Sequence, residues 1–255
     1  MTTIASPVVT TNSRFEAGRR ILAVTRLHFV NRVQILYTPL LALAAIFLLN
    51  YAIWWIVIAA NSSSQGTNHL GYSGAVSYIY IYGIVIAVQS TLRTFPFSLG
   101  FGVTRRDYYL GSALAFVTLS TLFAVVLTVM SVIEIATNGW GVGGRMFAPV
   151  YFTNSFWLAR FVMYLLVFLF CLFVGTVIAT VYMRWRATGI FVFFLCLGIV
   201  LLGAIAWITV AHGWPGVGNW FATTGTFGIV LWTLVPSAVS AAGGLLIIRR
   251  ATPKA

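Results

Sequence analysis

The residues that could carry acid–base, nucleophilic or metal chemistry are few and scattered. The chain of 255 residues has three acidic residues and three histidines, and the histidines, His28, His69 and His212, lie in three separate segments. A catalytic or metal centre needs such groups to converge on one point. No Ser/His/Asp set has a credible spacing either. The sequence therefore predicts that the chain is not an enzyme and holds no metal.

Cysteine and glycine patterns also lack a chemical signature. Cys171 and Cys196 both lie in apolar runs, which favours neither a disulfide nor a metal site. The glycine-rich segment TNGWGVGG, at 137–144, lacks the Lys-Ser/Thr ending of a phosphate-binding P-loop and follows an apolar run rather than a strand. We expect no nucleotide or other cofactor in this chain.

One short stretch concentrates the charge, FGVTRRDYYLG at 101–111. Only 7% of the chain is charged, yet Arg105, Arg106 and Asp107 are consecutive. Thr104 and Asp107 form an S/T-x-x-D pattern ahead of an apolar run, which predicts a helix start capped by both side chains. The two arginines do not suit a helix N-terminus. We interpret them as facing either lipid headgroups or acidic groups on a docked protein.

The elements around this stretch are predicted to be membrane-spanning helices. Hydrophobic residues make up 60% of the chain, and a helix needs about 20 apolar residues to cross a bilayer. The sequence predicts an all-α polytopic membrane protein rather than a nucleic-acid-binding one, because its basic residues lie in short segments beside apolar runs. Six charge-free runs are the predicted spans, at 36–60, 75–92, 108–133, 161–183, 187–211 and 220–248.

The basic residues predict the orientation of these spans. Of the 15 Lys and Arg residues, only Arg145 and Arg160 fall on one side of the predicted layout. The positive-inside rule then places both termini in the cytoplasm. The external loops would be 61–74, 137–144 and 212–219, which contain residues that end helices.

The segment before the first span is predicted to be an amphipathic helix, at 14–35, lying along the inner face of the bilayer. Its apolar residues recur every seven positions, with Val33 on the same side, and the repeat is formed by Phe15, Leu22, Phe29 and Leu36. The alternative is a disordered basic arm. Residues 1–13 are predicted to be disordered, and 251–255 form a C-terminal tail.

The connection between the second and third spans has apolar residues that a solvated linker would not need. Pro96, Gly100 and Gly102 predict that no continuous helix runs through it. Its apolar surface must be covered by lipid or by another protein, and it consists of Phe95, Phe97, Leu99 and Phe101.

These residues carry a family resemblance. Phe95, Pro96 and Phe97, together with GVTRRDYYLG at 102–111, resemble the cytoplasmic loop of many small bacterial membrane subunits of ABC-2 type transporters. The segment EIATNGWG, at 134–141, is similar to the outer end of the third span in that group. The layout of six spans with an amphipathic N-terminal helix matches over almost the whole chain.

The resemblance implies an ATP-driven exporter in the plasma membrane of a bacterium. Two membrane subunits, here expected to be identical, would dock on two copies of an ATPase subunit that binds ATP and Mg²⁺. A short cytoplasmic coupling helix between spans two and three would make the contact, through Phe95, Pro96, Phe97, Leu99, Gly102, Arg105 and Arg106. The substrate would be hydrophobic or amphipathic, such as a drug, peptide or lipid, moved by alternating access.

The chain departs from that family between spans five and six. Only HGWPGVGNW separates them, where family members often have a longer excursion with re-entrant helices. The segment 220–248 has room for a short re-entrant piece and a span.

Polar residues within or beside the spans are further candidates, because such groups are costly when alone. Glu134 and Arg160 are expected to form an ion pair that gates or stabilises the outer side, with direct substrate contact as the alternative. Asn50 and Gln89 are interpreted as hydrogen-bonding neighbouring helices, or as lining a substrate path.

A second function class remains open from the sequence. The chain could be a non-transporting membrane protein, such as an immunity protein or the anchor of a sensor.

Overall fold

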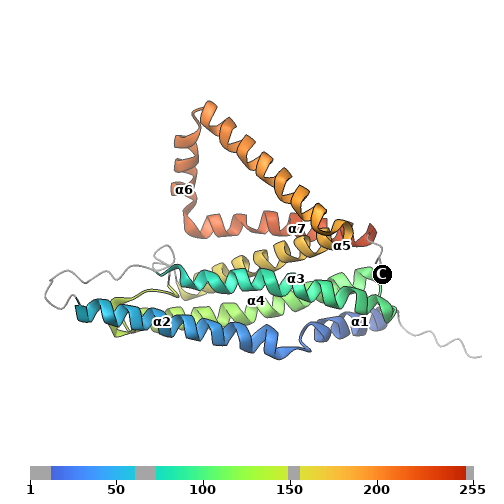
Figure 1. The fold of residues 1–255 in the computed structure, drawn as a ribbon, viewed down its shortest axis with the longest axis horizontal. Coiled ribbons are helices and arrows are strands. Elements are labelled where there is room, and N and C mark those ends of the chain that lie inside the picture. Colours follow the sequence, from blue (N-terminus) through green and yellow to red (C-terminus); the bar gives the residue numbers. More distant parts are fainter. Residues whose placement is uncertain (1–12, 61–72, 149–155, 251–255) are drawn as a thin grey trace, which may run out of the picture.

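The computed structural model describes residues 13–60, 73–148 and 156–250 (Figure 1). Throughout these ranges the chain is helical and has no strand, which confirms the predicted all-α class. The main helices are α1 (Ser13–His28), α2 (Thr38–Ala60), α3 (Ser77–Gly100), α4 (Arg105–Ala136), α5 (Trp157–Val210), α6 (Trp214–Trp232) and α7 (Leu234–Arg250). Shorter helical segments lie at Val33–Tyr37, Gly74–Val76 and Gly139–Gly143.

The helices are arranged as a bundle with an arm that stands away from it. Helices α2, α3, α4 and the first part of α5 run along the same direction, with α1 beside the start of α4 (Figure 1). The second part of α5 and α6 leave the bundle, and α7 returns along it. The bundle interior is apolar, with side chains that solvent does not reach, among them Ile79, Phe123, Leu127, Phe168 and Leu172.

The helices have the length and composition of membrane spans. Five of them are long and apolar enough to cross a bilayer, counting the segments Val33–Ala60, Gly74–Gly100, Arg105–Ala136, Trp157–Val210 and Trp214–Gly244. Their outer surfaces remain apolar, as expected of surfaces that face lipid. The membrane character that the composition predicts is therefore confirmed.

Helix α5 contains two of the predicted spans joined by a bend. Its 54 residues would extend about 80 Å if straight, more than twice the roughly 30 Å of hydrocarbon. The backbone leaves the helical conformation at Arg186, with φ 59° and ψ −152°. This bend lies in the short basic connection predicted between residues 183 and 187. Helix α6 is likewise interrupted, at Gly225.

The N-terminal helix differs from its prediction. Helix α1 ends at His28 rather than near residue 35, and the segment Val33–Tyr37 continues directly into α2. Two members of the predicted apolar stripe, Leu22 and Val33, are exposed, while Val24 and His28 are buried. The reason is that α1 packs against α4, so a protein surface and not the bilayer plane decides which face is covered. Residues 1–12 and 251–255 lie outside the described residues.

The contact between α1 and α4 depends on a glycine. The Thr25 hydroxyl donates to the Gly111 carbonyl over 3.0 Å. A Cβ at Gly111 would lie 2.6 Å from Val24 Cβ and 2.8 Å from the Ile21 carbonyl oxygen. Only a residue without a side chain therefore allows the two backbones to approach this closely.

Replacing Gly111 with alanine is expected to push α1 away from α4. Overpacking of this kind costs about 1–3 kcal/mol, and we expect the free energy of unfolding of the purified protein to fall by that amount. Gly18→Ala is the matched control, because a Cβ at Gly18 meets nothing within 4 Å. It should be neutral or slightly stabilising, since alanine favours a helix more than glycine does. Equal effects of the two substitutions would contradict the close contact.

Candidate functional site

The turn between α3 and α4 occupies residues 101–104, and no separate coupling helix lies between them in the described chain. The prediction that no continuous helix runs through this connection is confirmed, because α3 ends at Gly100 and α4 begins at Arg105. Pro96 itself does not end the helix, since α3 continues through it to Gly100. Pro96 removes only one backbone donor, and it does so in the last two turns of the helix, where the loss is tolerated without a break. The segment predicted to contact an ATPase therefore consists of the end of α3, the turn after it and the start of α4.

Gly102 ends α3. Its φ is +74°, the left-handed conformation in which glycine is favoured. The Gly102 amide donates to the Leu99 carbonyl over 3.0 Å, and the Val103 amide donates to the Ser98 carbonyl over 3.2 Å. These two bonds form a Schellman cap. The position predicted to contact an ATPase thus has a structural role of its own.

Thr104 begins α4. Its hydroxyl accepts from the Asp107 amide over 3.1 Å, so the predicted helix start at Thr104 is confirmed. The Asp107 carboxylate is turned instead to Arg20 of α1, whose Nε donates to Oδ2 over 2.9 Å. The sequence offered no signal for this partner, which is 87 residues away in the chain. The ion pair ties the first turn of α4 to α1.

Tyr108 fixes the end of α3 on the start of α4. Its ring lies edge-on to Phe95, with centroids 5.1 Å apart, and its hydroxyl is 2.8 Å from the Thr94 hydroxyl. Phe95 is only 2% exposed. Phe95, which is predicted to form or border a partner contact, is therefore buried inside the protein in this conformation and not exposed at the surface. Leu99 packs partly against the same cluster.

Two phenylalanines remain exposed on this anchored turn. Phe97 is 53% exposed and Phe101 is 74% exposed, and their ring centroids lie 4.8 Å apart. Pro96 and Arg106 are also exposed, whereas Arg105 is half-buried. We call Pro96, Phe97, Phe101 and Arg106 the docking face. The four apolar residues of this connection are thus divided. Phe95 and Leu99 pack in an internal cluster, whereas Phe97 and Phe101 lie on the exposed surface.

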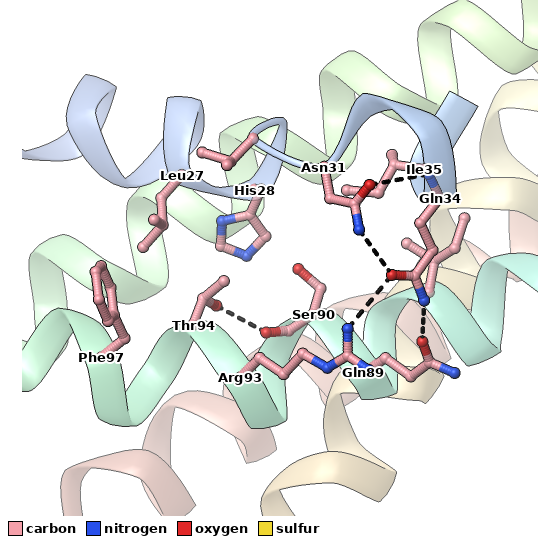
Figure 2. Close-up of a pocket in the computed structure, with 12 residues that line it drawn as sticks. Leu27, His28, Asn31, Gln34, Ile35, Gln89, Ser90, Arg93, Thr94 and Phe97 are labelled. Carbon is pink, nitrogen blue, oxygen red and sulfur yellow. Dashed lines mark hydrogen bonds between the residues drawn. The ribbon is translucent and has the colours of Figure 1, made fainter. Parts of the chain in front are cut away.

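Gln89 and Asn50 both bond to other parts of the chain. Gln89 accepts from the Gln34 side chain, which connects α3 to the segment before α2 (Figure 2). Asn50 donates to the Ile46 carbonyl over 2.8 Å and accepts from the Ser73 hydroxyl over 2.6 Å. This geometry agrees with the interpretation of both residues as hydrogen-bonding neighbouring segments.

Glu134, at the other end of α4, does not pair with Arg160. Its carboxylate accepts from the amides of Met146, Phe147 and Ala148, at 2.8–3.0 Å, and from the Trp140 indole at 3.1 Å. The expected ion pair is therefore wrong. The loop 137–148 folds back over the helix end through left-handed residues such as Asn138 and Gly139, and its amides reach the carboxylate first.

Arg160 is buried but does not form an ion pair with Glu134. It is 7% exposed, and its Nε and Nη1 bond to none of the residues that the structure describes. An ion pair does form at the opposite end of α4, between Arg20 and Asp107. No three His, Cys, Asp or Glu side chains converge on a metal site in the part of the chain that the structure describes.

His28 is the last residue of α1 and lies next to Tyr108 at the start of α4. Burial lowers the pKa of its imidazole, although a hydrogen bond from Nδ1 to the Val24 carbonyl acts in the opposite direction. Its ring faces Tyr108 and Phe116, at centroid distances of 6.1 and 5.8 Å. The ring is therefore neutral at neutral pH.

Comparisons of the chain with models of protein families, with curated proteins and with solved structures found no match.

The Glu134 geometry predicts that Glu134 and Arg160 are energetically independent. Glu134→Gln should lower the free energy of unfolding by about 2 kcal/mol or more, because an amide nitrogen would face groups that can only donate. Combined with Arg160→Gln, the effects should add to within about 0.5 kcal/mol. A coupling energy above about 1 kcal/mol in this double-mutant cycle would show that the two side chains do interact, as the sequence predicts.

His28 predicts a pH dependence of stability. The unfolded chain, in which the ring titrates near 6.5, binds the proton at a higher pH than the folded protein does. Burial of the neutral His28 ring contributes its full share to the free energy of unfolding above pH 6.5. This contribution is lost as the pH falls below that value, by at most about 1.4 kcal/mol per pH unit. Thermal unfolding in detergent between pH 7.5 and 5 should show this loss, and His28→Gln should remove it.

The matched control is His212→Gln, because His212 is exposed between α5 and α6. This variant should keep the wild-type pH profile. Identical profiles for wild type and His28→Gln would mean that another group causes the dependence.

Proposed function

We propose that the chain is the membrane-spanning subunit of an ATP-driven exporter of the ABC-2 type, and that its docking face binds a separate ATPase subunit. The observation that supports this most directly is the pair of exposed phenylalanines, Phe97 at the end of α3 and Phe101 in the turn after it, next to the buried side chains of Phe95 and Tyr108. ATP and Mg²⁺ would bind to that partner, and this chain would carry no catalytic residue.

The fixed geometry of the turn suits a docking role. It is held by the cap at Gly102, the cap at Thr104, the ion pair from Arg20 and the buried ring of Phe95. A surface that is already ordered loses little conformational entropy on binding. Exposed aromatic rings then provide apolar area, and the charge of Arg106 favours an acidic partner surface.

The arrangement of the helix ends supports a six-span topology. Divided at Arg186, α5 provides two segments of about 29 and 24 residues, each longer than the roughly 20 that a span needs. The turn after α3, the bend of α5 and the end of α7 lie at the same end of the molecule (Figure 1). These are the basic connections, so both termini and the docking face would be cytoplasmic.

The cluster beneath the docking face would transmit motion. It joins Val24 of α1, Phe95 of α3, Tyr108 and Tyr109 of α4, Met183 of α5 and Ala241 of α7. When ATP closes the ATPase dimer, a pull on the turn would therefore move several helices as one body, as in rigid-body gating. A second, identical copy would complete the pathway for a hydrophobic or amphipathic substrate.

Replacing both exposed phenylalanines with alanine should weaken ATPase binding at least tenfold, because the apolar centre of the contact is lost. Tagged protein would be purified from its native host, and the captured proteins searched for the ATP-binding sequence G-x-x-x-x-G-K-S/T. Phe156→Ala is the matched control, since Phe156 is 67% exposed and precedes α5. It should leave the capture unchanged.

The result also separates the two function classes. A stable protein that brings down no ATPase would overturn the proposal and favour a non-transporting immunity or sensor-anchor protein. Equal loss of capture for the control would mean that the docking face is elsewhere. Thermal unfolding of each variant checks that the fold is retained.

A further inference from the structure

A cavity lies between the junction of α1 with α2 and the last turns of α3 (Figure 2). Its volume is about 280 Å³, near the lower limit of about 300 Å³ for small-ligand pockets. Most of its wall is apolar and includes Leu27, Val30, Ile35, Ile86 and Phe97. The cavity lies beside the docking face and shares one residue with it, Phe97.

One side of the cavity is polar and internally connected. The Gln34 side chain accepts from Asn31 Nδ2 over 3.1 Å and from Arg93 Nη1 over 3.3 Å, and it donates to Gln89. Figure 2 shows these side chains converging from the α1–α2 junction and from α3. The network holds the Arg93 guanidinium at the cavity wall.

Arg93 has a positive charge without a negative partner. Gln34 is the only hydrogen-bond partner that it has among the described residues. The two acidic side chains that the structure describes are both engaged elsewhere, Asp107 with Arg20 and Glu134 with the outer loop. A guanidinium beside an apolar surface is stabilised by a carboxylate or phosphate, which it binds with two parallel hydrogen bonds.

His28 gives the cavity a second open polar group. Its Nε2 is buried and has no hydrogen-bond partner, and the ring points toward Ser90 and Thr94 of α3 (Figure 2). Because a carbonyl oxygen can only accept, Nδ1 is the nitrogen that donates to Val24. In the neutral ring Nε2 is therefore an acceptor. Such an acceptor can be completed only by a donor, such as water or the P–OH of a singly protonated phosphate. The anionic oxygens of a ligand would therefore bind at Arg93 and not at His28.

We propose that this cavity binds an anionic amphiphile, with its phosphate or carboxylate at Arg93 and its apolar chain against Leu27, Ile35 and Ile86. The cavity lies near the end of α3 that bears the docking face, the level at which headgroups meet acyl chains in the proposed topology. Binding of this ligand needs no ATPase, so the inference goes beyond the proposed function and shares with it only the proposed topology.

The test is binding of decyl phosphate to the purified full chain in nanodiscs of phosphatidylcholine, measured by isothermal titration calorimetry. Wild type should bind one equivalent per protomer, and decyltrimethylammonium should not bind. Arg93→Gln should weaken binding at least tenfold. Ser90→Phe, which fills the cavity and keeps Arg93, should weaken it similarly. Arg19→Gln, an exposed arginine on α1, is the control and should bind as wild type does.

A second measurement distinguishes a bilayer lipid from a free amphiphile. Nanodiscs that contain phosphatidylglycerol are titrated in the same way, and lipid retained by the protein is measured by native mass spectrometry. Retained phosphatidylglycerol with weakened decyl phosphate binding identifies a lipid as the occupant. Undiminished binding without retained lipid identifies a free amphiphile.

Two results would overturn the inference. Equal affinities of wild type, Arg93→Gln and Ser90→Phe would mean that the amphiphile only partitions into the bilayer. Equal binding of the anionic and cationic amphiphiles would remove the role of Arg93. Loss of ATPase capture by the phenylalanine variant bears on neither result, so this inference and the proposed function fail separately.

Discussion

The side chain of Tyr108 is the contact on which the end of the bundle near the turn between α3 and α4 depends. Its ring packs against Phe95 of α3 and faces His28 of α1, while its own backbone continues the capped start of α4. Helices α1, α3 and α4 are therefore held together by one residue that is 1% exposed. Tyr109 extends the contact to α7, because its hydroxyl donates to the Ala241 carbonyl. A rigid base of this kind is what allows the turn above it to present exposed rings in one orientation.

The two ends of α4 meet the same constraint in different ways. A carboxylate near hydrocarbon must be neutralised or fully hydrogen-bonded. Asp107 meets this requirement with a charged partner from α1, whereas Glu134 meets it with loop amides and an indole. Glu134 also lies at the helix C-terminus, where the helix dipole disfavours negative charge. The amide donors offset this unfavourable interaction with the helix dipole. By binding Glu134 they also hold the loop 137–148 against the bundle.

Local signals in the sequence predicted local structure well. Thr104 was predicted to cap a helix because its partner is three residues away, and the apolar runs predicted the long helices. Phe95 and Phe97 looked equivalent, since both are aromatic residues in one connection. They differ because residues two apart on a helix point in nearly opposite directions, and the rotation of α3 places Phe95 in the core. That rotation is set by packing against other helices, mainly α5 and, at Phe95, Tyr108 of α4. The sequence pattern does not reveal this packing.

Composition and charge by themselves determined that this chain is helical and built for a membrane, because charged side chains cannot remain in hydrocarbon. They also located the charged turn between α3 and α4. Tertiary structure alone decided which partner each costly polar group has. Arg20 binds Asp107 from 87 residues away, loop amides replace Arg160 at Glu134, and Arg93 faces a cavity. Hydrogen-bond partners depend on distances of a few ångströms, and only the packed helices set those distances.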